Sequence, residues 1–225
     1  RPCAIADDPI EKKPLALWHP GTRCLSLACT GCNLRCPNCQ NYAISQVGPD
    51  DVPYDECTPE QMVALARQHH LPTIAYTYTE PLTWIEYMTD IARLAHGAGL
   101  YNVLVSAGYV NEQPLRDLAP LLDAANVDLK SFSDETYRQY NRASLEPVLE
   151  VTLLLIPGIN TDDAGLHRMF RWLVDHDMAD CALHISRFFP MYKMQEAPAT
   201  PLADMRRAEA IAYDEGIAHV FLGNV

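Results

Sequence analysis

The chain has 225 residues, enough to bury one substantial core, and its hydrophobic fraction of 48% is ordinary for a globular protein. Its 17 basic and 29 acidic residues give a formal net charge of −12. This balance argues against a nucleic-acid backbone or an anionic membrane surface as the main partner. The sequence contains no apolar run long enough to cross a membrane.

Strand-like apolar runs alternate with amphipathic helical stretches along most of the chain. Residues 1–22 contain four prolines and are predicted to form an extended lead-in to a single core domain over residues 23–225. Thr58 followed by Pro59 is a helix start signal, an N-cap with proline at the first helical position. Repeated βα units predict a parallel sheet, either doubly wound or closed into a barrel. The predicted strands are 23–28, 73–78, 101–106, 125–130, 151–156, 181–186 and 218–222, and the predicted helices are 59–70, 82–96, 112–122, 163–177 and 202–215.

The interval between the fourth and fifth predicted strands is unusual. Residues 131–150 are enough for a crossover, which needs about a dozen residues, but 147–150 resemble a helix that begins just before a strand. Either the crossover is unusual or a segment is missing from this sequence. Because the first residue is Arg1 and residues 220–225 stop in or just after a strand-like segment, we expect the sequence to be the middle of a longer protein.

Five of the eight cysteines fall between positions 24 and 39. Such clustering favours a metal site in a reduced cytoplasm over a disulfide framework, so a cytoplasmic location is expected. Within the cluster, Cys32, Cys36 and Cys39 supply three thiolates, one fewer than a closed [4Fe–4S] site needs. An iron without a protein ligand is open to another molecule. In radical chemistry that molecule is S-adenosylmethionine (SAM), bound through its amino-acid end.

Zinc is the alternative occupant of this loop. Cys29 and Cys32 form one CxxC pair, and Cys36 and Cys39 form a second. Structural zinc sites separate such pairs by roughly a dozen or more residues, whereas here only three intervene. Gly31 can adopt backbone angles closed to other residues, and Pro37 stiffens the turn between the second and third ligands, so one loop can wrap a larger cluster. Cys29 is expected to be a small buried residue, because a fourth ligand would abolish the open iron.

Polar residues accumulate at the carboxyl ends of the predicted strands, where parallel βα folds place their active sites. Glu80 either accepts a hydrogen bond from the SAM ammonium group or only forms a Glu-Pro turn that opens the next helix. Asp128 and Lys130 either pair as a structural plug or hold the SAM carboxylate, directly or through a cation. His184 is either a satisfied core histidine or a functional residue of the rim.

The loop Gly31-Cys32-Asn33-Leu34-Arg35-Cys36-Pro37-Asn38-Cys39-Gln40-Asn41 resembles the cluster loop of the radical SAM branch that contains pyruvate formate-lyase activating enzymes. Further motifs are similar to the radical SAM enzyme of the AmmeMemoRadiSam system. The resemblance covers nearly the whole chain. The motifs that carry it are residues 8–15, 75–81, 125–130, 154–158, 184–188 and 192–194.

This resemblance implies a partial (β/α)6 TIM-like barrel of the radical SAM type, with one [4Fe–4S] cluster and SAM. By the same resemblance, Glu80 takes the place of the acidic contact with the SAM amino group, and Thr79 beside it is a further cofactor-binding residue. A monovalent cation near Asp128 is a further candidate. The resemblance also implies an electron donor such as flavodoxin or ferredoxin, and Memo-like and AMMECR-like proteins as partners. Cys32, Cys36 and Cys39 carry over as cluster ligands, and Ser106, Asp128, Lys130 and His184 match rim positions that contact SAM or its cation.

The function that follows is reductive cleavage of SAM at the open cluster. The products would be methionine and a 5′-deoxyadenosyl radical, which abstracts hydrogen from a substrate that the sequence does not identify. One alternative is an activating enzyme that installs a glycyl radical on a protein partner. A second alternative, from another class, is a metal-stabilised interaction scaffold without catalysis.

Overall fold

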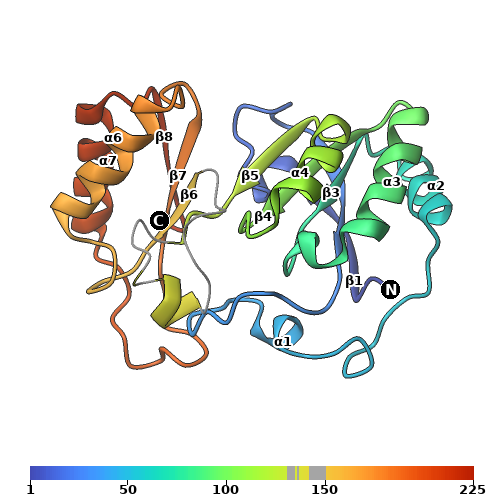
Figure 1. The fold of residues 1–225 in the computed structure, drawn as a ribbon, viewed down its shortest axis with the longest axis horizontal. Helices are drawn as coiled ribbons and strands as arrows, with labels where there is room; N and C mark the ends of the chain where they lie inside the picture. Colours follow the sequence, from blue (N-terminus) through green and yellow to red (C-terminus); the bar gives the residue numbers. More distant parts are fainter. Residues whose placement is uncertain (131–134, 136, 142–150) are drawn as a thin grey trace. The chain divides into compact units, whose positions relative to one another are not determined.

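The computed structural model describes residues 1–130, 135, 137–141 and 151–225 (Figure 1). It is a mixed α/β structure in which parallel strands alternate with helices, so the predicted fold class is confirmed. The chain divides into two compact units. The first unit comprises residues 1–33 and 41–127, and the second comprises residues 34–40 and 128–225. The predicted division into a lead-in over 1–22 and one core domain over 23–225 stays a prediction.

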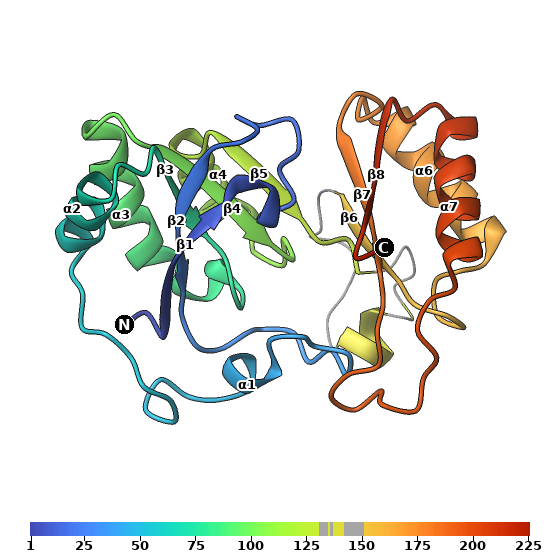
Figure 2. The same cartoon turned by 180° about the vertical axis from the view of Figure 1, so that it is seen from behind.

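The first unit is built on a five-stranded sheet with the order β1-β2-β3-β4-β5 (Figures 1 and 2). β1 runs antiparallel to β2, and every other neighbouring pair is parallel. The register aligns Cys24 with Thr73, Thr73 with Tyr101, and Val103 with Ala124. The strands are β1 (Ala4–Pro9), β2 (Arg23–Ala28), β3 (Thr73–Tyr76), β4 (Tyr101–Ser106) and β5 (Ala124–Val127).

Alternate residues of these strands build two separate cores, because successive side chains of a strand point to opposite faces. Leu25, Ile74 and Leu104 belong to a core cluster that also contains Met62 and Met88 of the helices. The opposite face carries a second cluster of Ile10, Leu15, Cys24, Ala75 and Val103. The segment that follows β1 therefore covers the sheet face that the helices leave open.

The helices of the first unit begin where local sequence signals place them. The Thr58 hydroxyl oxygen accepts a hydrogen bond from the Gln61 N–H, and the Gln61 side-chain oxygen accepts one from the Thr58 N–H. Pro59 occupies the first helical position. This capping box confirms the predicted helix start. The helices are α1 (Tyr42–Ser45), α2 (Pro59–Gln68), α3 (Ile85–Gly97) and α4 (Glu112–Leu118), with 3-10 turns at Ile10–Lys12, Pro81–Trp84 and Ala119–Leu121.

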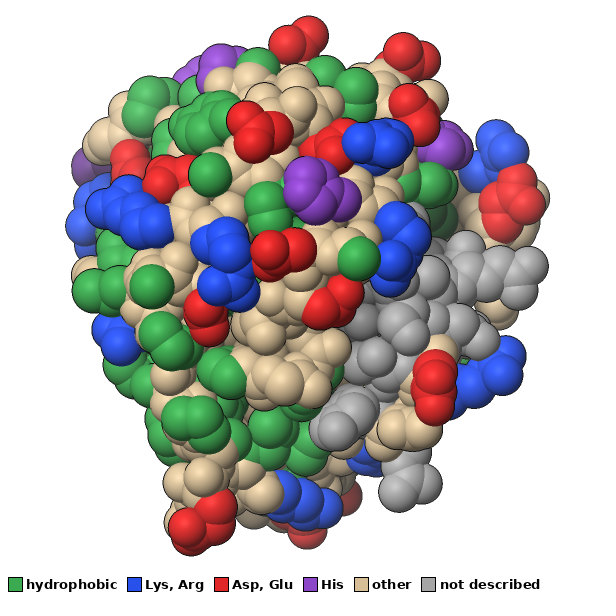
Figure 3. All heavy atoms as spheres, turned by 90° about the vertical axis from the view of Figure 1, so that its left-hand side faces the viewer, with side chains coloured by type: hydrophobic (Ala, Val, Ile, Leu, Met, Phe, Trp, Pro, Cys, Tyr) green, Lys and Arg blue, Asp and Glu red, His purple; other side chains and the backbone are tan. Residues whose placement is uncertain are grey.

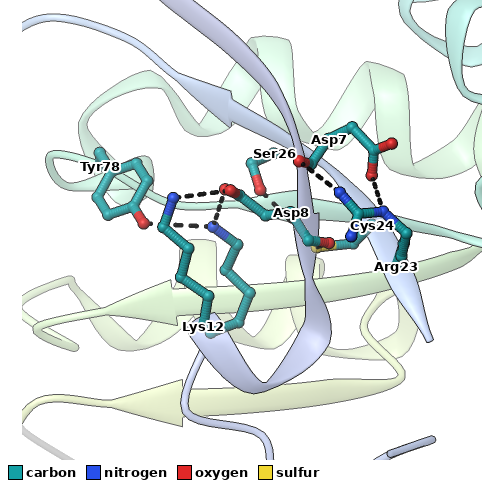
Figure 4. Close-up of polar contacts among 8 residues, drawn as sticks. Asp7, Asp8, Lys12, Arg23, Cys24, Ser26 and Tyr78 are labelled. Carbon is teal, nitrogen blue, oxygen red and sulfur yellow. Dashed lines mark hydrogen bonds and ion pairs between the residues drawn. The ribbon is translucent and has the colours of Figure 1, made fainter. Parts of the chain in front are cut away.

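A buried ion pair fixes the start of the chain against this sheet (Figure 4). Lys13 is 0% exposed, and its Nζ donates hydrogen bonds to Asp8 Oδ2 at 2.8 Å and to the Tyr78 hydroxyl at 3.3 Å. Lys12 donates to the other oxygen of Asp8 at 2.7 Å. Burial alone raises the pKa of Asp8, but hydrogen bonds from the two lysines and Ser26 outweigh it and lower that pKa to about 2. Asp8 is therefore ionised at any pH well above 2.

We expect Lys13→Met to lower the free energy of unfolding by about 3 kcal/mol, because it breaks a buried pair and leaves a buried carboxylate with fewer partners. Lys12→Met is the matched control, since Lys12 binds the same carboxylate from a side chain that is 53% exposed. The free energy of unfolding of Lys12→Met should fall by no more than about 1 kcal/mol. Urea unfolding of both variants measures the difference, and equal losses would contradict a special contribution from the buried lysine.

The second unit contains a three-stranded parallel sheet with the order β6-β7-β8. Its register aligns Thr152 with His184 and His184 with Phe221. Asp128 forms an isolated parallel bridge to Thr152. The elements are β6 (Thr152–Leu155), α6 (Asp163–Asp175), β7 (Ala182–Arg187), α7 (Leu202–Glu215), β8 (His219–Gly223) and a π-helical turn at Tyr137–Asn141.

Helices α6 and α7 lie side by side on one face of this sheet, and ion pairs join them (Figures 1 and 2). Arg171 of α6 donates two hydrogen bonds to Glu215 of α7, and His167 contacts the same carboxylate. Arg207 of α7 pairs with Asp163 of α6. The view from this side shows acidic and basic side chains interspersed, which is typical of a surface that faces solvent (Figure 3).

Most predicted elements are confirmed, with shifts at their ends. The strand predicted over 73–78 ends at Tyr76, and the one predicted over 125–130 ends at Val127. The predicted helix over 112–122 ends at Leu118 and continues as a 3-10 turn. The helix-like run at 147–150 lies outside the described residues. Among the helices that the structure describes, none is both long and apolar enough to span a bilayer.

Candidate functional site

The loop that follows β2 is anchored to the segment that follows β3. Gly31 adopts a φ of +91°, the left-handed region that favours glycine, as predicted. Its N–H donates to the Ile44 carbonyl at 3.0 Å, and its own carbonyl accepts from the Thr79 hydroxyl. The N–H of Cys29 donates to the Tyr78 carbonyl at 3.2 Å. The two segments therefore run together beyond the carboxyl ends of their strands.

The same loop reaches the end of β4. The Asn33 side chain donates to the Tyr109 carbonyl at 2.7 Å. Because Gly31 and Asn33 are both anchored, Cys32 lies between two fixed backbone positions. In this unit, the structure places the cysteine at the rim where the sequence predicted the active site to be.

Glu80 is fully buried and holds this rim together. Its Oε1 accepts from the Ser106 hydroxyl at 2.6 Å and from the Leu82 N–H at 3.1 Å, and its Oε2 accepts from the Ala107 N–H at 2.7 Å. It also caps the 3-10 turn that begins at Pro81. Glu80 therefore opens the turn at Pro81–Trp84, and this observation does not decide between the two alternatives. Its contact with SAM stays a prediction.

In the second unit, Cys36 and Cys39 lie on a single turn. The Cys39 N–H donates to the Cys36 carbonyl at 3.3 Å, with Pro37 at the second position of the turn, as the spacing predicted. The Lys193 N–H donates to the Pro37 carbonyl at 3.0 Å and anchors the turn from outside. The structure holds all eight cysteines of the chain as thiols.

Two neighbouring groups stabilise the thiolate of Cys36, although burial disfavours it. Burial raises the pKa of the Cys36 thiol above its ordinary value, and the Lys130 ammonium and a hydrogen bond from Asn141 offset only part of that rise. The Asn141 amide donates to Cys36 Sγ at 3.0 Å. Thiolate is the form of cysteine that binds metal. Sequence reasoning missed Asn141, since nothing in its local pattern links it to a cysteine 105 residues earlier.

Cys29 differs from Cys36 in its surroundings. It is buried, as predicted, and burial raises the pKa of its thiol to about 11. At neutral pH a thiol with that pKa is protonated, and a protonated thiol is a poor metal ligand. The environment of Cys29 is therefore that of a packed core residue.

Asp128 and Lys130 pair with each other through a hydrogen bond from the lysine ammonium. Both side chains are partly exposed, so the pair is open to solvent on one side. Asn160, which sequence reasoning also missed, lies beside this pair, and its amide donates to the Lys130 carbonyl at 3.5 Å. Its amide donates to the Leu154 carbonyl at 2.9 Å and its oxygen accepts from the Ile156 N–H at 2.7 Å. The pairing is observed, and the role in holding SAM stays a prediction.

His184 lies on β7 of the second unit, where its ring stacks on Phe221 with centroids 5.1 Å apart and planes inclined by 19°. Its side chain is 9% exposed, and Nε2 has no hydrogen-bond partner among the described residues. Burial lowers the pKa of His184. A buried nitrogen without a partner is costly, which favours the functional alternative over a satisfied core histidine.

The lowered pKa of His184 predicts a pH-dependent loss of stability. As the pH falls below the ordinary value of 6.5, the unfolded state takes up the proton before the folded state does. We therefore expect the wild-type free energy of unfolding to fall more steeply below about pH 6.5 than that of His184→Phe, which keeps a ring against Phe221. Denaturant unfolding at a series of pH values from about 7.5 down to about 5, on both sides of the ordinary histidine pKa, measures both slopes. His69→Gln, an exposed change, should keep the wild-type slope.

Within each unit, the structure brings together most of the residues that the sequence predicted for the site. Thr79, Glu80 and Ser106 join the cysteine loop in the first unit, and Cys36, Asp128 and Lys130 gather in the second. In the described part of the chain, no three His, Cys, Asp or Glu side chains are placed so as to hold a metal ion. The ligand set of Cys32, Cys36 and Cys39 therefore stays a prediction from their spacing. The donor chemistry fits an iron–sulfur cluster, because Cys36 is buried beside a cation and an amide donor.

Comparisons with known proteins agree with this picture. The family model described as "Radical SAM superfamily" matches residues 27–161. An uncharacterized protein of Methanocaldococcus jannaschii, MJ0808, is 41% identical over 236 aligned positions that cover 99% of this chain and 70% of the relative.

Two solved structures share the fold. A domain of the pyruvate-formate lyase-activating enzyme from Bacteroides vulgatus aligns with a TM-score of 0.53 and 15% identity, over 67% of this chain and 98% of that domain. QueE from Escherichia coli aligns with a TM-score of 0.57 and 10% identity, over 98% of this chain and 92% of that one.

Proposed function

The chain belongs to the Radical SAM superfamily, whose members are enzymes, and we propose that it cleaves SAM reductively at a [4Fe–4S] cluster. The observation that carries this proposal is the run Cys32, Cys36 and Cys39, which lies inside the residues matched by the family. Three thiolates leave one iron of such a cluster without a protein ligand. The family implies both the cluster and SAM.

A cluster held by this chain would supply the one electron needed to cleave the bond between sulfur and C5′ of SAM, and the products would be methionine and a 5′-deoxyadenosyl radical able to abstract hydrogen from a substrate. The residues of the chain position and shield the reacting groups. We propose that Cys32, Cys36 and Cys39 hold the iron. The anchors at Gly31 and Asn33 fix the loop before it binds anything, which lowers the entropic cost of binding.

We propose that the SAM amino group lies at the rim formed by Thr79, Glu80 and Ser106. This rim carries a carboxylate that hydrogen bonds from Ser106, Leu82 and Ala107 already orient. Asp128, Lys130 and His184 are proposed contacts of SAM in the second unit, with a monovalent cation near Asp128. The unpartnered Nε2 of His184 supports this assignment.

We propose two kinds of partner for this chain, an electron donor and further proteins. The electron is expected from a donor such as flavodoxin or ferredoxin, and Memo-like and AMMECR-like proteins are proposed as further partners. Hydrogen abstraction from a glycine of a protein is the alternative reaction. Deuterium transfer from a labelled glycine into 5′-deoxyadenosine would identify that alternative, and transfer only from a small molecule would exclude it.

We expect Cys36→Ala to lose the cluster and the formation of 5′-deoxyadenosine together, because two thiolates hold the cluster poorly. Cys57→Ala is the matched control, since Cys57 lies outside the loop and the hydrogen bond that it accepts from Tyr87 uses its backbone carbonyl. Iron and sulfide analysis and product detection after anaerobic reduction with SAM measure both effects. Full iron loading of Cys36→Ala, or a wild-type protein that holds a cluster but never cleaves SAM, would count against the proposal.

We expect Glu80→Gln to weaken SAM binding about tenfold or more, which corresponds to a loss of about 1.4 kcal/mol when a charged acceptor becomes neutral. Glu86→Gln is the control, because it removes an exposed carboxylate six positions later and changes the net charge equally. Equilibrium dialysis, performed where circular dichroism shows each variant to be folded, gives the dissociation constants. An unchanged constant in Glu80→Gln would remove Glu80 from the SAM site.

A further inference from the structure

Asn141 is a buried amide placed against a cysteine that the proposed function assigns to the cluster. Asn141 is 5% exposed, and its Nδ2 donates to Cys36 Sγ at 3.0 Å. Its main-chain carbonyl accepts from the Arg35 N–H at 2.8 Å. Two hydrogen bonds to consecutive residues of the loop therefore fix both the position of Asn141 and the direction of its amide.

We propose that Asn141 sets the reduction potential of the iron–sulfur cluster through its hydrogen bond to the Cys36 sulfur. This inference rests on the proposed function, because it needs Cys36 to be a ligand of the cluster. Asn141 is a positioning residue that acts through the ligand.

The direction of the effect follows from where the added electron goes. Reduction increases the negative charge on the cluster and on its sulfur ligands. A donor that points at a ligand sulfur stabilises the reduced state more than the oxidised one, so it raises the reduction potential. The contact is buried, and a hydrogen bond is electrostatically stronger in a medium of low dielectric constant than in water.

The two hydrogen bonds of Asn141 use different parts of the residue, so an effect on the cluster can be distinguished from an effect on the loop backbone. The contact between the Arg35 N–H and the Asn141 carbonyl uses only the backbone, so it survives any side-chain change at position 141. The contact with Cys36 uses only the side chain. A substitution at Asn141 therefore removes the donor to sulfur and leaves the backbone anchor of the loop in place.

The test compares Asn141→Leu and Asn141→Ala with the wild type and with Gln139→Ala. Leucine has nearly the shape of asparagine and no donor, whereas alanine leaves room for a water molecule to replace the amide. Gln139 is an exposed amide on the same turn, and its recorded partner is Glu135, so its removal matches the loss of an amide without touching sulfur. The cluster is reconstituted anaerobically in each protein, and the reduced fraction is followed by electron paramagnetic resonance at poised potentials.

We expect iron and sulfide contents to match the wild type in all variants. At a fixed potential, Asn141→Leu should show a ratio of reduced to oxidised cluster about tenfold lower than the wild type, which is ~59 mV for a one-electron couple. Asn141→Ala should show a smaller fall in the same direction, and Gln139→Ala should match the wild type.

Three results would overturn the inference. The first is a midpoint potential in Asn141→Leu equal to that of the wild type. The second is loss of the cluster from both Asn141 variants, which would assign the residue a structural role. The third is a wild type without any cluster, which would overturn the proposed function as well. A wild type that cleaves SAM while all four potentials agree would overturn this inference alone.

Discussion

The hydrogen bonds that tie the loop after β2 to the segments after β3 and β4 are the constraint on which the candidate site depends. A loop that carries metal ligands must hold thiolates close together in space, and an unanchored loop would pay a large entropic cost to do so. Here Gly31 and Asn33 are each fixed to a different neighbouring segment. Parallel strands make this possible, because their carboxyl ends meet along one edge of the sheet.

Glu80 shows how one side chain serves the architecture of the rim and its proposed chemistry together. A buried carboxylate is tolerated only where donors surround it, and Ser106, Ala107 and Leu82 provide them. Those donors also hold the end of β4 beside the turn that begins at Pro81. The charge that would attract an ammonium group is therefore part of the framework that shapes the rim.

The start of the chain is integrated into the first unit by charge as well as by packing. Ile10 and Leu15 join the core on the sheet face opposite the helices, while Lys13 places its ammonium between Asp8 and Tyr78. Tyr78 directly precedes Thr79 and Glu80. The buried pair thus contacts the same segment that anchors the cysteine loop.

The sequence by itself determined the family and the alternation of strands and helices, whereas the ends of β3 and β5 came only from the structure. The spacing of Cys32, Cys36 and Cys39, the Thr58 cap and the need for a glycine at position 31 are local properties that a linear pattern records. Only the tertiary structure decided that Asn141 donates to Cys36, that Lys13 and Asp8 form a buried pair, and that Glu80 receives the Ser106 hydroxyl. These contacts join residues distant along the chain. Their partners are chosen by which strands and turns become neighbours on folding, and no local periodicity carries that information.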